Sequence, residues 1–260
     1  MGKRTFFAAE RKIQIVDYIN DNKKATVKEL SKIFNVSPST IRGDLRDLEK
    51  ENQIVKAHGG ALVKTKTSFE TNLETRRHLN LEAKNKIGKT ALNLIEDGDT
   101  IILDTGSTTI ELAKLLSSKK DISVLTNDLK IALLLDNYPH FNIFLLGGSL
   151  RRNYHCTNIS GFSDNSVFAN LTVDKAFIGT NGFSYTKGAT TPDFLQAETK
   201  KFMISLSHNI IILCDSSKIG KDFFIPFAPL KNINILITDS IYDKYKKEIE
   251  KRGVSVLVAD

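Results

Sequence analysis

The chain has 260 residues, 41% of them hydrophobic and 26% charged, which predicts one or two folded domains and excludes a peptide hormone or a wholly disordered protein. No run approaches the roughly 18–20 apolar residues of a membrane span and no signal sequence opens the chain, so we expect a cytoplasmic protein without a membrane partner. Cys156 and Cys214 lie outside any Cys-x-x-Cys or Cys/His array, which excludes a disulfide framework and structural zinc.

The net charge of +7 is concentrated in the first quarter of the chain. Residues 1–67 carry 14 Lys and Arg against 8 Asp and Glu, whereas residues 68–260 carry 23 against 22. This asymmetry predicts a basic domain over residues 1–66 and a nearly neutral domain over residues 67–260. A basic patch is the minimum footprint of a nucleic-acid-binding surface, and charge alone leaves a solubilising lysine-rich face equally open.

Three helices are predicted in the basic domain. Apolar residues between positions 9 and 20 have spacings that favour a helix over a strand. Thr26 opens a capping-box pattern, which predicts a second helix over residues 27–34. Ser37 is a suitable N-cap and Pro38 suits the first helical position, so a third helix is predicted to begin at Pro38.

The third helix combines an apolar stripe with a basic, hydroxyl-bearing face. The stripe consists of Ile41, Leu45 and Leu48, which are spaced by four and three residues. Two helices joined by a short turn, the second opening with small polar residues and arginines, are typical of a helix-turn-helix, whose second helix enters the major groove. The alternative is a solvated face whose arginines pair with Asp47 and Glu49. The candidate DNA-binding residues of this face are Ser37, Ser39, Thr40, Arg42 and Arg46.

A hairpin is predicted after the third helix. The segments 54–56 and 61–63 flank His58-Gly59-Gly60, which is typical of two strands joined by a glycine turn. Beside a helix-turn-helix such a hairpin forms a wing, which would place Lys56 and His58 near the DNA backbone or the minor groove. Thr26, before the second helix, completes the predicted DNA-binding set.

Three motifs of the basic domain occur together: Arg11-x-x-x-Ile15, the segment Ser-Pro-Ser-Thr-Ile-Arg-Gly-Asp-Leu over residues 37–45, and His58-Gly59-Gly60-Ala61. They resemble the DNA-binding signature of the DeoR family of bacterial sugar-catabolism regulators. The family usually has a second arginine where this chain has Gly43. The glycine removes one phosphate or base contact and weakens the helix, so the resemblance implies no particular operator sequence.

Helical and strand-like segments alternate from about residue 80 onward. Short apolar strands separated by helices predict a mainly parallel sheet covered on both faces, so the fold class is α/β. Ligands in such folds bind beyond the C-terminal ends of the strands. Helices are predicted over 80–94, 109–116, 128–137, 195–208 and 241–251, and strands over 100–103, 123–125, 142–146, 175–178, 210–213, 235–237 and 255–258.

Small polar residues follow several of these strands, which predicts a shared pocket. The turn over residues 104–109 contains Gly106 and can direct backbone N–H groups and hydroxyls at an anion, although the same pattern is an ordinary helix start. It is not a Walker A loop, so nucleotide hydrolysis has no support. Lys218 either supplies a point charge to a phosphate or lies on the surface. The other polar strand ends are Thr126-Asn127-Asp128, Gly147-Gly148-Ser149, Gly179-Thr180-Asn181-Gly182 and Asp215-Ser216-Ser217-Lys218.

These strand ends, together with Gly161, stand in the order of the DeoR family's C-terminal sensor domain, so the resemblance spans about residues 8–240. It implies a fold related to ribose-5-phosphate isomerase, and a phosphorylated sugar as regulatory ligand with no other cofactor. By this resemblance Gly106, Ser107 and Thr108 form the phosphate cradle, Lys218 lies across the pocket, and Asn127, Asp193, Glu198 or Asp215 bind sugar hydroxyls. The implied effector site comprises Asp104, Thr105, Gly106, Ser107, Thr108, Thr126, Asn127, Gly147, Gly148, Arg151, Asn181, Asp193, Glu198, Asp215 and Lys218.

A sugar-phosphate isomerase or deaminase-like enzyme, fused to a DNA-binding module, is the alternative. Its proton transfers would need carboxylates or histidine held over the substrate. Related isomerases carry paired carboxylates in the loop that corresponds to residues 179–183, where this chain has Gly-Thr-Asn-Gly-Phe. We therefore predict no catalytic residue. His155 and Cys156 lack a third ligand, so no metal is predicted, and Arg151 either reaches an anionic ligand or lies on the surface.

The patterns together with the resemblance to the DeoR family lead us to expect a sequence-specific repressor, and the resemblance implies that its target is a sugar-catabolism operon. Its affinity for double-stranded operator DNA would change when a phosphorylated sugar binds the second domain. The protein is expected to self-associate as a homodimer or homotetramer. Two symmetry-related recognition helices would then read half-sites about 10 base pairs apart, or a multiple of that spacing.

Overall fold

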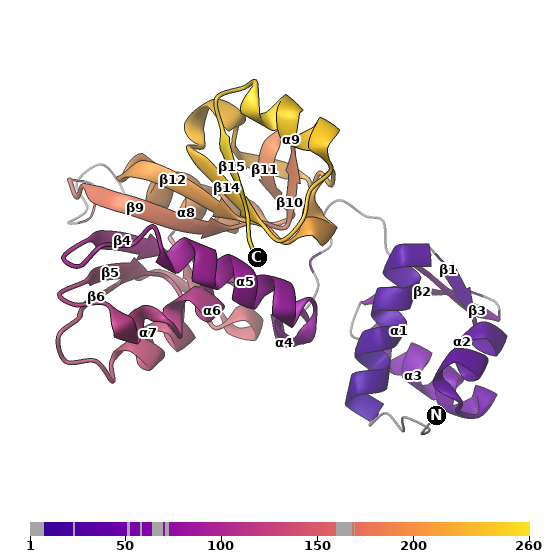
Figure 1. The fold of residues 1–260 in the computed structure, drawn as a ribbon. Helices are drawn as coiled ribbons and strands as arrows, with labels where there is room; N and C mark the ends of the chain where they lie inside the picture. Colours follow the sequence, from indigo (N-terminus) through magenta and orange to yellow (C-terminus); the bar gives the residue numbers. More distant parts are fainter. Residues whose placement is uncertain are drawn as a thin grey trace. The chain divides into compact units, whose positions relative to one another are not determined.

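The computed structural model describes residues 8–22, 24–50, 53–57, 59–63, 70, 73–159, 168 and 170–260. The chain divides into two compact units, Met1–Leu79 and Asn80–Asp260 (Figure 1). The polar stretch over residues 64–68, Gly161 and His58 lie outside the described residues. No helix in the described part of the chain is long and apolar enough to cross a membrane.

In the part that the structure describes, the first unit contains four helices and a three-stranded antiparallel sheet. The second and third helices have the predicted starts, and the first is longer than predicted. Thr26 caps α2 through a complete capping box with Glu29, and Asn35 ends it in the left-handed conformation, at φ 52°. The helices are α1 (Ala8–Asn22), α2 (Val27–Phe34) and α3 (Pro38–Lys50), followed by the short α4 (Leu73–His78).

The predicted wing is confirmed, and one strand of its sheet was not predicted. The hairpin of β2 (Ile54–Ala57) and β3 (Gly60–Val63) is extended by β1 (Lys24–Thr26) in the order β1-β3-β2, and Figure 1 labels the three strands. Gly60 pairs with Thr26, and a Cβ at Gly60 would lie 2.2 Å from the carbonyl oxygen of Ala25. A glycine is therefore required for β1 to approach the hairpin. The sheet and helices share a core that includes Ile15, Leu30, Ile41, Leu45 and Ile54.

The second unit is built on a seven-stranded sheet in the order β15-β14-β12-β9-β4-β5-β6. Every pair of neighbouring strands in this sheet is parallel, which confirms the α/β fold class. Its strands are β4 (Thr100–Leu103), β5 (Ser123–Thr126), β6 (Asn142–Leu145), β9 (Val173–Gly179), β12 (Ser207–Leu213), β14 (Ile235–Thr238) and β15 (Ser255–Val258).

Helices cover both faces of this sheet. Ile101 and Leu103 of β4 belong to one buried cluster, whereas Ile102 belongs to another, because successive side chains of a strand point to opposite faces. The first cluster includes residues of α5 (Leu81–Leu92), α6 (Thr109–Ala113) and α7 (Leu129–Leu135). The second includes residues of α8 (Phe194–Ser205) and α9 (Asp243–Glu250). Burial on both faces explains why inner strands such as β4 are continuously apolar in the sequence, whereas the edge strand β6 is largely exposed.

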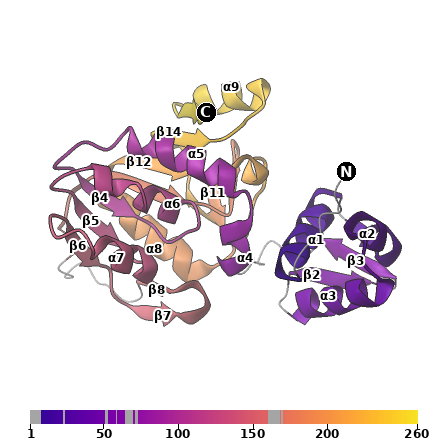
Figure 2. The same ribbon diagram turned by 60° about the horizontal axis from the view of Figure 1, so that its bottom comes forward.

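Two smaller sheets accompany the parallel sheet, and neither was predicted. One is antiparallel, with β10 (Gly182–Ser184), β11 (Gly188–Thr191) and β13 (Ile225–Ala228) in the order β10-β11-β13. The other is a hairpin of β7 (Ser149–Arg151) and β8 (Cys156–Asn158), visible in Figure 2. The prediction of a helix through His208 was also wrong, since α8 ends at Ser205 and His208 lies in β12.

Candidate functional site

A buried ion pair positions the third helix of the first unit. Arg11 of α1 donates two hydrogen bonds to Asp44 of α3, from Nε to Oδ2 at 2.7 Å and from a terminal nitrogen to Oδ1 at 3.2 Å. Both residues are buried, and the hydrogen bonds to Asp44 raise the pKa of Arg11. Two parallel bonds fix orientation as well as distance. The first and third helices are therefore held in one register, with the polar face of α3 turned outward.

The start of α3 presents a group of hydroxyls. The Oγ of Ser37 accepts a hydrogen bond from the backbone N–H of Thr40 at 3.1 Å, which caps the helix. The same oxygen lies 2.7 Å from Ser39 Oγ and 2.8 Å from Thr40 Oγ1. Three of the predicted DNA-binding residues are thus brought together at the end of the helix that carries partial positive charge.

A groove of about 400 Å³ separates α3 from the wing. Arg42 and Glu49 line it from the helix, and Lys56 and Gly59 line it from the hairpin. The side chains of Arg42, Arg46 and Lys56 are exposed. This arrangement places two of the predicted basic residues on opposite walls of one groove.

The alternative interpretation pairs the arginines with Asp47 and Glu49, and the pKa of Asp47 is lowered by its hydrogen bond with Lys12 and, among weaker causes, by the charge of Arg46. Asp47 pairs with Lys12 at 2.5 Å, and within the described part of the chain no ion pair joins Arg42 or Arg46 to Asp47 or Glu49. Thr26, also predicted to bind DNA, has its hydroxyl bonded to Glu29 in the capping box, at 2.8 Å. Its clearest role in the structure is therefore to begin α2.

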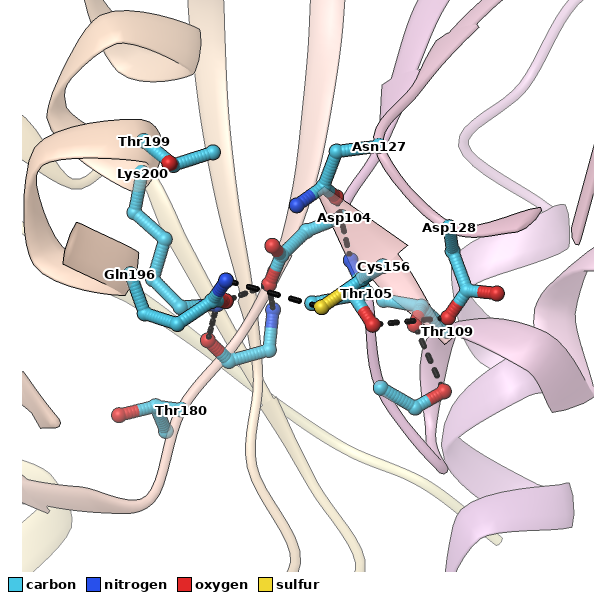
Figure 3. A network of polar contacts seen from close by, with 12 residues as sticks. Asp104, Thr105, Thr109, Asn127, Asp128, Cys156, Thr180, Gln196, Thr199 and Lys200 are labelled. Atoms are coloured by element: carbon cyan, nitrogen blue, oxygen red, sulfur yellow. Dashed lines mark hydrogen bonds and ion pairs between the residues drawn. The ribbon is translucent and has the colours of Figure 1, made fainter. Parts of the chain in front are cut away.

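In the second unit, the C-terminal ends of the parallel strands bring the predicted polar turns to one edge of the sheet. At the centre of this edge Asp104, directly after β4, forms a buried ion pair with Lys200 of α8 (Figure 3). Lys200 also donates to the carbonyl oxygen of Gly179 at 3.0 Å, and the N–H of Gly179 donates to Asp104 Oδ2 at 2.9 Å. These contacts join β4, β9 and α8.

The Asp104 carboxyl group is completely buried, and its hydrogen bonds go to one of its two oxygens. Burial raises its pKa, and the ammonium group of Lys200 opposes this rise. Its Oδ1 accepts no hydrogen bond within the described part of the chain. Lys200 was not predicted as a site residue, but it lies with Ala197 and Met203 on the buried stripe of α8. A lysine at this helical spacing is the sequence signal that could have identified it.

The turn after Asp104 is fixed by the neighbouring strand end, as Figure 3 shows. The N–H of Thr105 donates to Asn127 Oδ1 at 3.0 Å, and the Thr105 hydroxyl donates to Asp128 Oδ2 at 2.8 Å. Asn127 Nδ2 donates to the carbonyl of Thr157 at 2.9 Å. Both ends of the buried Asn127 amide are therefore occupied by the protein itself, so Asn127 shapes the turn.

The predicted cradle, Gly106, Ser107 and Thr108, leads into α6. Within the described part of the chain, the backbone N–H groups of these three residues donate no hydrogen bond. The side chains of Ser107 and Thr108 are buried, and the Thr109 hydroxyl donates to the Gly106 carbonyl at 3.0 Å. Successive N–H groups without acceptors at the start of a helix are suited to an anion.

A second charged group lies at the end of β12. Lys218 Nζ is 3.1 Å from Asp215 Oδ2, and Asp215 is only 1% exposed. Burial alone would raise the pKa of Asp215, but Lys218, the hydroxyl of Ser217 and the charge of Lys84 outweigh it and hold the pKa below its usual range. Lys84, on α5, is itself buried and was not predicted.

The remaining predicted effector residues have varied surroundings. Arg151 pairs with Asp193 at 2.9 Å and stacks on Tyr154, and Asp193 also caps α8. Glu198 is half-exposed and pairs at 2.9 Å with Lys201 of the same helix, so it lies on the surface of α8. The buried Thr126 accepts a hydrogen bond from the N–H of Asp128. The other predicted residues at this edge are Gly147, Gly148 and Asn181. Gly148 approaches Asn158 so closely that a glycine is required, and the N–H of Asn181 donates to the carbonyl oxygen of Thr190.

The two cysteines are both buried. Burial raises the pKa of Cys156 to about 11, and Gln196 Nε2 lies 3.7 Å from its sulfur. Burial also raises the pKa of Cys214 above its usual range. Both thiols are therefore protonated at neutral pH and are poor nucleophiles. In the described part of the chain, no three His, Cys, Asp or Glu side chains are grouped so that they could hold a metal ion.

Two family models match this chain, over separate stretches of the sequence. Residues 11–67 match the DeoR-like helix-turn-helix domain, and residues 79–240 match the DeoR C terminal sensor domain. The HTH-type transcriptional regulator GolR of Listeria innocua is 35% identical over 98% of this chain and 100% of its own length. The HTH-type transcriptional repressor GlcR of Bacillus subtilis is 33% identical over 98% of this chain and 97% of its own.

A solved D-ribose-5-phosphate isomerase, in complex with phospho-erythronic acid, is 23% identical and covers 54% of each chain with a TM-score of 0.40. The fold assignment rests on the sheet topology rather than on this likeness. A winged helix-turn-helix together with an α/β sensor domain defines a DNA-binding transcription regulator that responds to a small molecule. The chain belongs to the DeoR family of transcriptional regulators. The alternative of a sugar-phosphate enzyme is therefore set aside.

Proposed function

We propose that the protein represses a sugar-catabolism operon and that a phosphorylated sugar, bound at the C-terminal edge of the parallel sheet, lowers its affinity for operator DNA. The repressor assignment is supported by the name of the Bacillus subtilis relative, which covers nearly the whole chain. The two domains in this proposal are residues 1–66 for DNA binding and residues 67–260 for effector binding and self-association.

The observation that carries the effector proposal is the turn over residues 106–108. Its three backbone N–H groups donate no hydrogen bond within the described part of the chain, at the start of α6. A phosphate group accepts several hydrogen bonds at once, which suits such a cradle. Lys218, which follows β12 at the same edge, supplies a compact positive charge for the same group.

Hydroxyl-binding groups are also available at this edge. Asn181 follows β9 at this edge. Arg151 and Asp193 form a polar pair on β7 and at the start of α8. Recognition of a sugar in this arrangement combines charge-assisted bonds to the phosphate with directional bonds to hydroxyls.

The DNA-binding part of the proposal uses the outward face of α3 and the wing. The residues that would contact bases and phosphates in the major groove are Ser39, Thr40, Arg42 and Arg46. Ser37 would hold the Ser39 and Thr40 hydroxyls in place through its hydrogen bonds with them. Lys56, on the opposite wall of the groove, would contact the DNA backbone. His58, which lies outside the described residues, is proposed from its place in the sequence as a second wing contact.

Thermal unfolding of the full-length protein in the presence of individual sugar phosphates tests the effector proposal. A ligand at 100 times its dissociation constant adds about 2.7 kcal/mol to the free energy of unfolding, which raises the unfolding temperature measurably. The Lys218→Met variant should lose most of this stabilisation, whereas Lys231→Met, at an exposed position, should keep it. If no sugar phosphate stabilises the wild type, the assigned ligand class is wrong.

A further inference from the structure

The loop that follows β12 holds the first residue of the second unit. Asn80 Nδ2 donates to Asp215 Oδ1 at 3.1 Å and lies 3.1 Å from Ser217 Oγ. Ser217 in turn donates to the same carboxylate oxygen, and Lys218 pairs with Oδ2. The Asn80 side chain at the start of the unit is thus bonded to Asp215, which is 135 residues further along the chain and lies in the same loop as Lys218.

Asn80 stands where the chain from the DNA-binding unit enters the sensor unit. The first unit ends at Leu79 and the second begins at Asn80, directly before α5. The backbone of Asn80 is left-handed, with φ 52°, a conformation that asparagine tolerates better than most residues. Its carbonyl accepts the first hydrogen bond of α5, from the N–H of Lys84 at 3.1 Å. The Asn80 side chain therefore joins the entry point of the second unit to the loop that follows β12.

The partners of Asp215 are coupled through its charge. The carboxylate is almost completely buried and is stabilised by Lys218, Ser217, Asn80 and the nearby charge of Lys84. A buried carboxylate that loses a cation must gain other partners or move toward water, because an uncompensated buried charge is strongly unfavourable. An anion that draws Lys218 away would therefore change the balance of contacts around the carboxylate to which Asn80 is bonded.

We propose that Asn80 is a latch through which effector binding is transmitted to the chain segment leading to the DNA-binding unit. The inference rests on the proposed function: an anionic effector pairs with Lys218, the loop over residues 215–218 rearranges, and Asn80 loses its two acceptors. The latch is closed without effector and open with it. The two states differ in contacts that the effector itself alters, which is the requirement for allosteric coupling.

The variant Asn80→Gly tests the latch without any effector. Glycine keeps the left-handed backbone and removes only the side chain. Full-length protein is titrated, at fixed salt, with the DNA fragment that the wild type selects from a random pool. The open latch predicts a loss of DNA affinity of about 5- to 150-fold, the usual range of allosteric coupling. The control Asp121→Gly, an exposed left-handed residue in the same unit, should bind DNA like the wild type.

Two further readouts separate a latch from a general loss of structure. Asn80→Asp keeps the shape of the side chain but places a second carboxylate against Asp215, so it should show the same loss of affinity. The slope of log affinity against log salt should stay at its wild-type value, because the DNA contacts lie in the other unit. Wild-type affinity in Asn80→Gly would overturn the latch.

The response to ligand distinguishes this inference from the proposed function. D-ribose 5-phosphate and D-glucose 6-phosphate serve as probes. A probe that stabilises the wild type should weaken its DNA binding, and should stabilise Asn80→Gly without weakening its DNA binding further. If neither probe stabilises the wild type, the proposed ligand class loses support, while the DNA affinity of Asn80→Gly still decides whether the latch exists. Equal weakening of wild type and variant by a bound probe would contradict the latch.

Discussion

Two glycines inside helices of the described chain have opposite surroundings. A Cβ at Gly88 of α5 would lie 3.1 Å from the backbone nitrogen of Leu112, so Gly88 lets α5 and α6 pack closely. A Cβ at Gly43 of α3 would meet nothing within 4 Å, and the backbone of Gly43 has no positive φ. Helix packing therefore explains Gly88, whereas nothing within the first unit requires a glycine at position 43.

Replacing each glycine by alanine tests this difference. Gly43→Ala should raise the free energy of unfolding by about 0.5–1 kcal/mol, because alanine restricts the unfolded chain and favours the helix. Gly88→Ala should lower it by about 1–3 kcal/mol, since the backbone of α6 must move. Urea unfolding, monitored by hydrogen exchange within each unit, measures the change in the free energy of unfolding for both variants. Destabilisation by Gly43→Ala would show that position 43 has a contact within the protein.

The ion pair of Asp104 and Lys200 leads to a prediction about pH. Burial raises the pKa of Asp104, so its contribution to stability is greatest below the ordinary aspartate pKa, about 3.9, and falls as the pH rises. Lys200→Met removes the opposing cation and should raise this pKa further. The variant should lose about 3–5 kcal/mol of unfolding free energy at pH 7.

The loss caused by Lys200→Met should be smaller at a lower pH than at pH 7, because protonation of the Asp104 carboxyl removes the unpaired buried charge. Urea unfolding at the two pH values, with exchange measured over residues 80–260, checks this. Asp104→Asn in the same variant should restore much of the stability at pH 7. A loss that is independent of pH would mean that Asp104 is not the group responsible.

At the scale of elements, α3 and the wing are predicted to divide the work of DNA binding. Arg42→Ala should weaken binding to the selected DNA by about 1–3 kcal/mol and relax the preference at one base pair. Lys56→Ala should weaken binding to all sequences alike and reduce the salt slope by about one. Titrations with selected and scrambled DNA at several salt concentrations measure both effects. Equal, sequence-independent losses in the two variants would contradict base reading by Arg42.

Elements with strong end signals were predictable from the sequence. The capping box at Thr26 and the Ser37-Pro38 pair gave the starts of α2 and α3 correctly. The strands of the parallel sheet were predictable because each contains a short apolar run, which in the inner strands is buried on both faces. The end of α8 was not, because no glycine or proline separates it from β12.

The short strands were missed for a different reason. β1 has only three residues and depends on Gly60, which lies 34 positions further along the chain. The sheets of β7–β8 and of β10, β11 and β13 likewise consist of strands of three or four residues. Segments of this length show too few alternations for a periodic pattern, and their pairing is decided by tertiary contacts.

The candidate effector site was predictable in its turns but not in its buried cations. Parallel strands place all their C-terminal ends at one edge, so the polar turns could be grouped from the sequence alone. Lys84 and Lys200 lie within helices, and their burial depends on the elements packed against them. Asn80 resembles an ordinary helix-start residue in the sequence, and only the structure shows its bond to Asp215.

At the scale of the whole molecule, one chain has a single recognition helix, α3, with which to read one half-site of DNA. Self-association with two-fold symmetry would place two α3 helices on half-sites about 10 base pairs apart, or a multiple of that spacing. Sedimentation of the full-length protein should therefore show a dimer or tetramer, and footprints on selected DNA should show paired half-sites. A monomer that protects a single half-site would contradict this prediction.

The most direct test of the central claim is the affinity of the full-length protein for its selected DNA, measured at one fixed salt concentration with and without each sugar phosphate. The account predicts that one sugar phosphate lowers the affinity and that Lys218→Met abolishes its effect. If every sugar phosphate leaves the affinity of the wild type unchanged, the edge of the sheet is not the regulatory site proposed for it.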